Sequence, residues 1–303
     1  MVKISKVTQQ KVSIQDLERE SAYYQEKFSS LKNLLDFYTA IFIAQLNVLS
    51  EIKKVSPPID QKELENRLEE GLPATERTSL MIDSKEFTKS LEKICETVSK
   101  KISGKKKLKT GLKNLLESKK LKSLDLAKLI ANLQKGDASE LADLSDEVSL
   151  KPETLSFLLY NAIVPFYKEA ALDILANLDI SQWKNGFCPI CGSRPNIARC
   201  RLEDGLKVLR CSLCQTQWGH QRLKCVFCGN DDPKTLHYFF NEDDKGHRVE
   251  VCEKCKKYLK ISDERVFNRE VIPEVEDVAT FLLDVVAEKK DYSPIITIAK
   301  DLN

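Results

Sequence analysis

The chain has 303 residues, of which 42% are hydrophobic and 31% are charged, a composition that is ordinary for a globular protein. This length is sufficient for two or three domains that each bury a core of their own. The formal net charge of +2 excludes a global electrostatic bias toward nucleic acid or membrane surfaces.

Two segments bear on the location of the protein. The first 15 residues lack the apolar core of a secretory signal peptide. The most apolar stretch, residues 37–49, includes Gln45 and Asn47. It is shorter than the roughly 20 apolar residues that a membrane-spanning helix needs. We therefore expect a cytoplasmic protein that does not insert into a membrane.

Residues 1–182 are predicted to form an α-helical domain. Between residues 13 and 54, apolar residues recur mostly at steps of three or four, which is the period of a helix with one buried face. Glycine and proline lie mostly between such runs, and no segment alternates as a strand would. Further helical runs are expected at about 60–71, 84–102, 110–134 and 153–178.

The composition changes at Trp183. Turn signals at Asp204-Gly205 and Lys245-Gly246 accompany short alternating segments at 207–210 and 248–251, a pattern that predicts β-hairpins. The predicted fold class is therefore α+β.

A closing helix is expected at 274–288. Its predicted buried face contains Val275, Val278, Phe281, Leu282 and Val285.

The ten cysteines are distributed unevenly. Cys95 alone lies in the first 187 residues, and nine cysteines lie between Cys188 and Cys255. In a chain without a signal peptide, such a cluster favours metal binding over disulfides. Eight of the nine form four Cys-x-x-Cys pairs, namely Cys188/Cys191, Cys211/Cys214, Cys225/Cys228 and Cys252/Cys255.

The spacing of these pairs predicts two metal sites. Two residues between the cysteines let the backbone turn sharply, so that both sulfurs point at one ion, and two such knuckles make a closed tetrahedral site. Nineteen residues separate the first pair from the second, and 23 separate the third from the fourth, both suited to a hairpin. Gly192 and Gly229 follow a knuckle and permit the positive φ that aims N–H groups at sulfur. We expect two ions per chain, each held by four thiolates.

The metal and its role remain open at this point. Binding of a structural zinc ion contributes about 10–16 kcal/mol to the folding free energy of small domains. Each ion could therefore have a purely structural role, in which it holds the two hairpins of its site together. A closed four-thiolate site offers no position to a substrate, which argues against metal catalysis. Thiolates suit zinc and iron alike. Cys-Pro-x-Cys-Gly at 188–192 is also the knuckle of rubredoxin-type iron sites.

The remaining reactive residues predict no catalytic site. Cys95 and Cys200 are expected to be packed side chains, and His220, His237 and His247 follow no Cys/His ligand spacing. The sequence contains no Ser/His/Asp spacing, phosphate-binding loop or paired carboxylates. We therefore expect a protein that is not an enzyme, with no catalytic residues and no small-molecule substrate.

One segment is strongly basic. Residues 100–122 contain ten lysines and a single acid, Glu117. The segment could dock an acidic partner or nucleic acid. The simpler interpretation is a solvated helix face and loop.

The cysteine region resembles a known family. From Trp183 the chain reads Trp-Lys-Asn-Gly-Phe-Cys-Pro-Ile-Cys-Gly-Ser-Arg-Pro, then Cys-Ser-Leu-Cys-Gln-Thr-Gln-Trp at 211–218 and Cys-Val-Phe-Cys at 225–228. This succession resembles FdhE, the formate dehydrogenase accessory proteins. The segment 276–284 is similar to the closing helix of that family, and the specific match covers about residues 183–290.

The resemblance implies an architecture and a function. It implies two rubredoxin-like/zinc-ribbon modules, which we place at 183–222 and 223–262, bound to the helical domain and followed by a C-terminal helix and tail at 263–303. The eight paired cysteines match the metal ligands, and iron is the implied metal. The implied function is a cytoplasmic maturation protein, or chaperone, that binds the catalytic subunit of respiratory formate dehydrogenase.

Two other functions compete with this one. A zinc-ribbon nucleic-acid-binding protein is disfavoured, because residues 188–260 hold 14 Lys/Arg against 9 Asp/Glu, a formal charge of +5. Two four-thiolate sites with divalent ions subtract about four charges and leave a net charge of about +1. This charge is too small to bind a phosphate backbone well. The third candidate is a rubredoxin-like electron carrier, in which iron cycles one electron.

Overall fold

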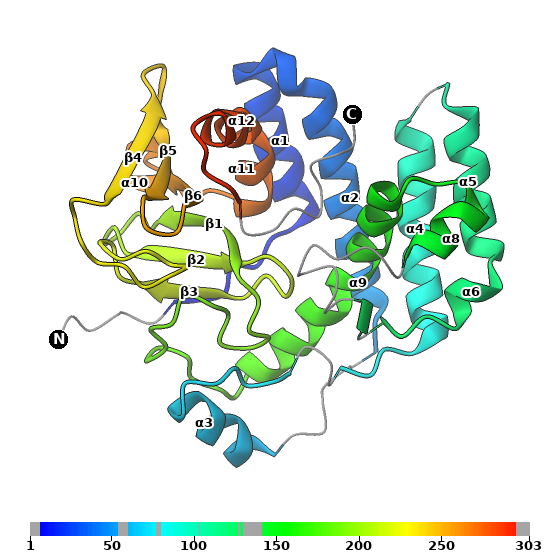
Figure 1. The fold of residues 1–303 in the computed structure, drawn as a ribbon, viewed down its shortest axis with the longest axis horizontal. Helices are drawn as coiled ribbons and strands as arrows, with labels where there is room; N and C mark the ends of the chain where they lie inside the picture. Colours follow the sequence, from blue (N-terminus) through cyan, green and yellow to red (C-terminus); the bar gives the residue numbers. More distant parts are fainter. Residues whose placement is uncertain are drawn as a thin grey trace.

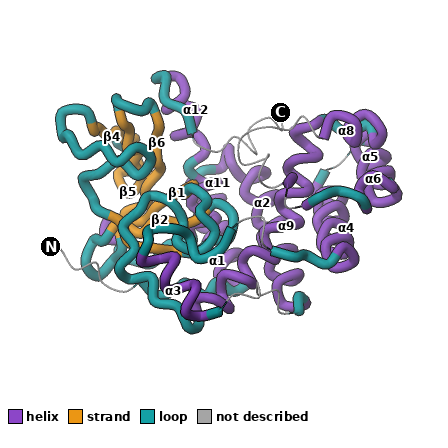
Figure 2. The backbone as a smooth tube through the Cα atoms, turned by 60° about the horizontal axis from the view of Figure 1, so that its bottom comes forward, coloured by secondary structure: helices purple, strands orange, loops and turns teal. Residues whose placement is uncertain are grey.

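The computed structural model describes residues 7–53, 60–76, 80–102, 104–126, 128–129 and 141–294. Helices form the N-terminal part of the chain, and a six-stranded sheet with C-terminal helices follows (Figure 1). Figure 2 shows the strands gathered at one end of the molecule and the helices α4, α5, α6 and α8 at the other. The predicted α+β fold class is confirmed.

The elements have the following bounds. The N-terminal part contains α1 (Ile14–Lys27), the 3-10 turn η1 (Ser29–Leu31), α2 (Lys32–Glu51), α3 (Gln61–Glu69), α4 (Ser84–Lys101), α5 (Lys106–Glu117), α6 (Lys119–Lys122), α8 (Ala142–Val148) and α9 (Pro152–Leu175). The second part contains β1 (Pro195–Cys200), β2 (Lys207–Cys211), β3 (Gln217–His220), β4 (Leu236–Asn241), β5 (Asp244–Cys252), β6 (Lys257–Asp263), α10 (Glu264–Phe267), α11 (Pro273–Ala279) and α12 (Phe281–Lys289).

The predicted helical run at 13–54 is two helices. Ser13 and Asp16 form a capping box at the start of α1, which satisfies N–H groups that have no partner within the helix. Phe28, with φ −127° and ψ 73°, leaves the helical conformation and ends α1. The chain re-enters a helix at Lys32, and α1 and α2 together enclose an apolar cluster with α11.

Helix α9 is the centre of the helical part. It matches the run predicted at 153–178, and 15 of its 24 residues are buried, as expected for a helix that is apolar on every side. Helices α2 and α4 pack against it. Within the described ranges, no helix is both long and apolar enough to cross a membrane.

The run predicted at 110–134 differs in the structure. Helix α5 begins earlier, at Lys106, and ends before Ser118, whose extended backbone and side chain cap the short helix α6. Residues 130–134 lie outside the described residues. Helix α8 was not predicted, because its seven residues are too few to display a clear period.

The sheet has the strand order β3-β2-β1-β6-β5-β4. Strands β1–β3 and β4–β6 each form an antiparallel unit, as the hairpin signals predict. A parallel pairing of β1 with β6 joins the two units, with Ile197 opposite Lys260 and Cys200 opposite Asp263. The two cysteine-bearing segments therefore share one continuous sheet, which no local pattern in the sequence predicts.

One of the two predicted turns is wrong. The Asp204-Gly205 turn connects β1 and β2, and Gly205 has φ +66°. Lys245-Gly246 is not a turn, because the chain reverses between Asn241 and Asp244 and Gly246 lies within β5. A Cβ atom on Gly246 would lie 2.2 Å from the Phe267 ring. The glycine is needed for this close approach, not for chain reversal.

The predicted closing helix is also interrupted. Helix α11 ends at Ala279, and α12 begins at Phe281 after Thr280, which has φ −98° and ψ 18°. The Thr280 hydroxyl donates to the Glu276 carbonyl at 2.7 Å. The interruption changes which side chains share a face, so Leu282, predicted to be buried, is 56% exposed.

Candidate metal centres

The eight paired cysteines lie in two clusters. The members of each cluster come from the first and second pairs, or from the third and fourth, which is the grouping that the spacing predicts. In both clusters the four sulfurs lie within 4.8 Å of one another. The first cluster contains Cys188, Cys191, Cys211 and Cys214, and the second contains Cys225, Cys228, Cys252 and Cys255.

The knuckles of the first cluster share one local geometry. Gly192, with φ +69°, donates its N–H to the Cys188 carbonyl at 3.0 Å and closes the turn. The Ile190 N–H points at the Cys188 sulfur and the Leu213 N–H at the Cys211 sulfur, both at 3.4 Å. Such N–H groups stabilise thiolate charge, so the loops are shaped for deprotonated cysteine.

Both clusters have the dimensions of a four-thiolate metal site. Adjacent sulfurs are 3.4 Å apart for Cys188 and Cys214 and 3.5 Å apart for Cys191 and Cys211. The corresponding distances are 3.7 Å for Cys225 and Cys255 and 3.8 Å for Cys228 and Cys252. A tetrahedron with metal–sulfur bonds of about 2.3 Å has edges of about 3.8 Å. The residues present therefore fit a single zinc or iron ion in each cluster.

Cys95 and Cys200 lie outside both clusters. Cys95 is 2% exposed on α4, and burial raises the pKa of its thiol to about 12. Cys200 is fully buried at the end of β1, where its sulfur accepts a hydrogen bond from Arg248 at 3.2 Å. Both are packed side chains, as the sequence predicts.

The three histidines also lie apart from the clusters. His237 is exposed on β4. His220 is buried, and burial together with the nearby charge of Lys207 lowers its pKa to about 4. His247 lies at the centre of a buried network that the sequence does not predict.

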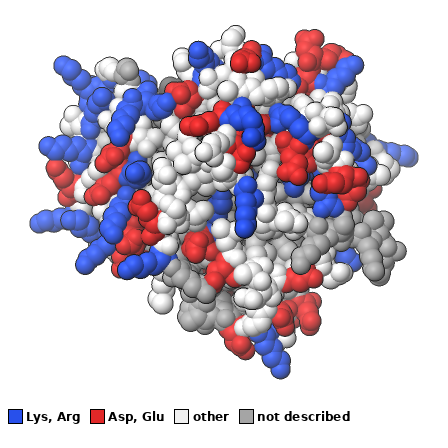
Figure 3. Space-filling model, turned by 180° about the vertical axis from the view of Figure 1, so that it is seen from behind, with Lys and Arg blue, Asp and Glu red and all other residues white. Residues whose placement is uncertain are grey.

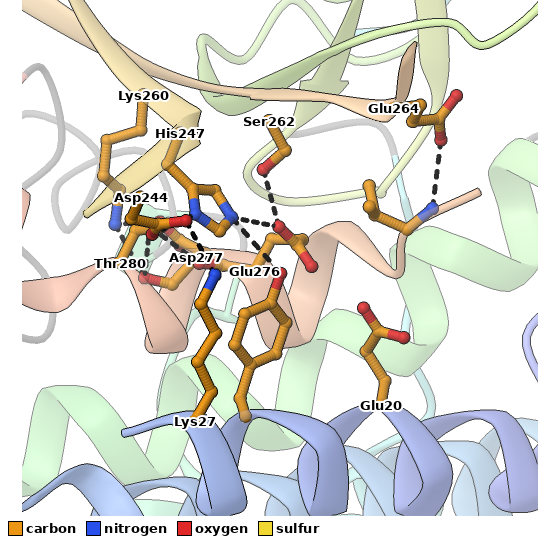
Figure 4. A network of polar contacts seen from close by, with 12 residues as sticks. Glu20, Lys27, Asp244, His247, Lys260, Ser262, Glu264, Glu276, Asp277 and Thr280 are labelled. Carbon is orange, nitrogen blue, oxygen red and sulfur yellow. Dashed lines mark hydrogen bonds and ion pairs between the residues drawn. The ribbon is translucent and has the colours of Figure 1, made fainter. Parts of the chain in front are cut away.

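This network joins α1, the sheet and α11 (Figure 4). His247 Nε2 lies 2.5 Å from Glu276 Oε2, and Nδ1 lies 2.6 Å from Asp244 Oδ2. Ser262 donates to the same Glu276 oxygen at 2.8 Å. From α1, the Tyr24 hydroxyl lies 3.3 Å from His247 Nε2. A histidine with a carboxylate at each ring nitrogen donates from both nitrogens and is therefore positively charged.

The ionisation of the network follows from these contacts. Burial opposes the charge of His247, but the hydrogen bonds and charges of Asp244 and Glu276 outweigh it and raise the pKa of His247 to about 9. Burial also raises the pKa of Glu20, which lies beside Glu276, to about 7, although Arg269 contacts both of its oxygens at 2.7 Å. The network therefore favours a protonated His247 at neutral pH.

A row of buried ion pairs continues from this network along the sheet. In each pair a strand supplies the cation and the C-terminal segment supplies the acid. The pairs are Arg199–Glu264 at 2.8 Å, Arg210–Glu274 at 2.9 Å, Lys260–Asp277 at 2.6 Å and Lys260–Asp284 at 2.8 Å. A buried charge that loses its partner costs several kcal/mol, so these pairs fix where the C-terminal helices sit.

The sequence feature that indicates these buried ion pairs is a basic residue within an otherwise apolar strand. Lys260 interrupts the run Tyr258-Leu-Lys-Ile261, and Arg199 lies between Ala198 and Cys200. A charged residue in a strand that is otherwise apolar indicates a buried partner. Which acid supplies that partner depends on the parallel pairing of β1 with β6, so the sequence alone does not predict the pairs.

Comparisons with known proteins agree with the cysteine pattern. Residues 187–222 match the family model of the FdhE central domain, and residues 223–295 match that of the FdhE C-terminal domain. An FdhE homolog from Aquifex aeolicus is 29% identical over 272 residues, which cover 88% of each chain. The FdhE protein of Escherichia coli O127:H6 is 29% identical over 180 residues, 54% of this chain and 55% of its own.

A solved structure has the same fold. The crystal structure of the FdhE protein from Pseudomonas aeruginosa has a TM-score of 0.63 to this chain, with 20% sequence identity. The match covers 94% of this chain and 95% of that one. It therefore includes the helical part, which neither family model reaches.

The ligand assignment predicts a metal content. The purified protein should contain two zinc or iron ions per chain, and Cys188→Ser should lower the content toward one, because three thiolates no longer close the first site. Cys200→Ser is the matched control and should retain two ions. Elemental analysis checks both variants. Two ions in the Cys188→Ser protein would show that Cys188 is not a ligand.

The network predicts that stability falls with rising pH. The folded-state pKa of His247, about 9, lies above its ordinary value of 6.5. Its contribution is therefore complete below pH 6.5 and is lost as the pH rises through 9. For Glu20 the raised pKa gives the same direction, with a loss that begins above its ordinary 4.5 and passes through about 7. The free energy of unfolding should fall by on the order of 3 kcal/mol between pH 6.5 and 9.5.

Urea unfolding at a series of pH values measures this slope. His247→Gln should be less stable by about 3–5 kcal/mol at pH 6.5, because it leaves the buried carboxylate of Glu276 without its cationic partner, and should lose most of the slope. His237→Gln, which alters an exposed histidine, should behave as the unsubstituted protein. A His247→Gln profile parallel to that of the unsubstituted protein would refute the role of His247.

Proposed function

Because this chain belongs to the FdhE family, we propose that it matures respiratory formate dehydrogenase by binding the catalytic subunit of that enzyme. The observation that carries the proposal is the pair of four-cysteine clusters within the segments that match the two FdhE domains. Four thiolates around one ion leave no coordination position for a substrate. Such a site is therefore suited to stabilising the fold of a binding surface and not to catalysing a reaction. The protein itself turns over no formate and acts in the cytoplasm.

The proposed ligands are the eight clustered cysteines. Each ion fixes two knuckles of one antiparallel unit and so holds the hairpins in the shape that a partner contacts. Iron is the metal that the family resemblance implies, and zinc satisfies the same donor set. The cluster dimensions support four-thiolate coordination and are compatible with either metal.

The basic segment at 100–122 supplies a second element of recognition. It forms α5, α6 and the end of α4, and its lysines are exposed apart from the apolar faces of these helices. Lys100, Lys101, Lys113 and Lys120 each have a carboxylate within 4.0 Å. Among the described residues, no carboxylate lies within that distance of Lys106, Lys107 or Lys109.

Figure 3 shows basic side chains crowded along the edge of the molecule where these helices lie, with acidic ones between them. Like charges held close together on a surface raise the rate at which an acidic partner is captured. We assign this surface, the basic face, to the encounter with the catalytic subunit. A stable complex buries roughly 1,600 Å², so the sheet is expected to contribute as well.

An exposed aromatic pair on β4 is the feature that a nucleic-acid partner would use. Tyr238 and Phe240 on β4 are 63% and 38% exposed, and their rings stack with centroids 6.2 Å apart. Exposed stacked aromatics bind single-stranded nucleic acid when a basic groove accompanies them. Two cations on the neighbouring strands are already paired, Arg248 with Asp263 and Lys207 with Glu250. The exposed aromatic pair therefore suits a protein surface better than a phosphate backbone.

The test of the proposal is direct binding together with enzyme maturation. The metal-loaded protein should capture the purified catalytic subunit in a pull-down, and cells that lack this protein should lose most formate oxidation. Formate oxidation should return when the protein is supplied again. Unchanged activity in the deleted strain, together with no detectable binding, would refute the function. Binding of single-stranded nucleic acid instead would establish the second candidate.

The role of the basic face can be tested by measuring association rates of lysine variants with the catalytic subunit. Replacing Lys106, Lys107 and Lys109 with Gln should slow association about tenfold at low salt and change dissociation little, because the lysines act through long-range attraction. Lys234→Gln with Lys245→Gln, on the opposite part of the molecule, is the control. Equal association rates for both variants would remove the basic face from the encounter.

A further inference from the structure

We propose that the two cysteine clusters differ in access: the first is a sealed metal site, and the second is an open site that exchanges its ion with solution through Cys228. This property concerns the chain alone and holds whether or not the partner is a formate dehydrogenase. It rests on burial, on the contacts that cover each cluster and on the position of each cluster in the sheet.

Burial separates the two clusters. All four cysteines of the first cluster are at most 2% exposed. In the second, Cys225 and Cys252 are buried, whereas Cys255 is half-buried and Cys228 is exposed. The second cluster therefore presents an exposed cysteine to solvent, and the first presents none.

Backbone hydrogen bonds from the helical part close over the first cluster. The Ala74 N–H donates to the Pro189 carbonyl at 2.7 Å, and the Thr75 N–H donates to the Ile190 carbonyl at 2.9 Å. The Thr75 hydroxyl adds a third bond to the same Ile190 oxygen at 3.1 Å. The knuckle that carries Cys188 is therefore clamped on both of its middle residues by a segment more than a hundred positions earlier.

Helix α9 covers the other knuckle and the space between. The Tyr160 hydroxyl donates to the Ser212 carbonyl, between the two cysteines of the second pair. Tyr167, Ala170 and Ile174 of α9 share a small apolar cavity with Ile190 and Cys191. The four cysteines belong to the same continuous core as α9. Exposing them requires separation of the sheet from the helical part.

Among the described residues, no backbone hydrogen bond from the helical part reaches the second cluster. The fourth knuckle is instead contacted by the C-terminal segment, where the Ser293 N–H donates to the Lys256 carbonyl at 2.9 Å and the Tyr292 hydroxyl donates to Glu253. In Figure 1 the β4–β5 hairpin lies at the end of the sheet farthest from α4, α5 and α6. One end of the third knuckle is anchored, because Val226 packs so closely on Gly186 that a Cβ there would lie 1.7 Å from the Val226 carbonyl oxygen. The other end, at Cys228, faces solvent. The side chain of Asn230 donates to the Cys252 sulfur at 3.6 Å.

Different opening costs follow from these surroundings. Local opening near an exposed edge costs far less free energy than opening of a buried core. Cys228 can leave its position while Cys225 stays anchored, and the helical core is undisturbed. The outer strand β4, which carries the exposed Tyr238 and Phe240, would loosen at its cysteine end with loss of the second ion, whereas the junction between sheet and α9 would persist.

Chelation of the zinc-loaded protein by excess 4-(2-pyridylazo)resorcinol tests the proposal. One ion per chain should leave in a fast phase, and the second should leave at least about tenfold more slowly. Alkylation with iodoacetamide during the fast phase, followed by peptide mass spectrometry, should label Cys228 and Cys255 and leave Cys188 and Cys211 unlabelled.

Two variants separate this result from general instability. Cys228→Ser should abolish or accelerate the fast phase and leave the slow phase unchanged, and Cys95→Ser should leave both phases unchanged. Loss of both ions in a single phase would overturn the proposal. Labelling of Cys188 together with or before Cys228 would overturn it as well.

Discussion

The need to neutralise four buried sulfurs at the junction of α9 and the sheet is the constraint on which the rest of the structure depends. The first cluster is at most 2% exposed and belongs to the same core as α9. Thiolates packed at such distances repel one another and are costly to bury, and a cation at their centre removes both penalties. Because the knuckle at 188–191 also carries the hydrogen bonds from Ala74 and Thr75, the same site that closes the first hairpin unit fastens it to the helices.

The sheet is held on its other side by charge. His247 lies between Asp244 and Glu276, and three basic residues of the sheet, Arg199, Arg210 and Lys260, each face an acid of the C-terminal segment. Such pairs contribute little net stability, but breaking one is costly, so they specify position more than they strengthen the fold. The cysteine modules are thus fixed between α9 and α11, and β5 is tied to α11 through His247, which leaves β4 as the outer strand of the sheet. A rigid binding surface lowers the entropy cost of association, and one mobile strand at the edge of the sheet can still adjust to a partner.

The sequence predicts what local geometry determines. Cys-x-x-Cys spacing fixes how two sulfurs meet, so the grouping into two clusters follows from residue counts. The buried state of Cys95 follows from its place beside the apolar face of a predicted helix. The helical period identifies α4 and α9 because each buries a long apolar stripe. The parallel pairing of β1 with β6 joins residues that are far apart in the sequence and has no local signal. The prediction of a turn at Lys245-Gly246 is wrong because glycine occurs both in turns and at close contacts, and here the contact is with Phe267.

Anomalous diffraction from crystals of the metal-loaded protein, recorded above and below the absorption edges of zinc and iron, tests the two-site structure most directly. Two peaks per chain should appear, one surrounded by the sulfurs of Cys188, Cys191, Cys211 and Cys214 and the other by those of Cys225, Cys228, Cys252 and Cys255. The edge at which the peaks appear identifies the metal. A peak at the first cluster with a Cys–Cys bond in place of the second, or a peak beside His247, would contradict it.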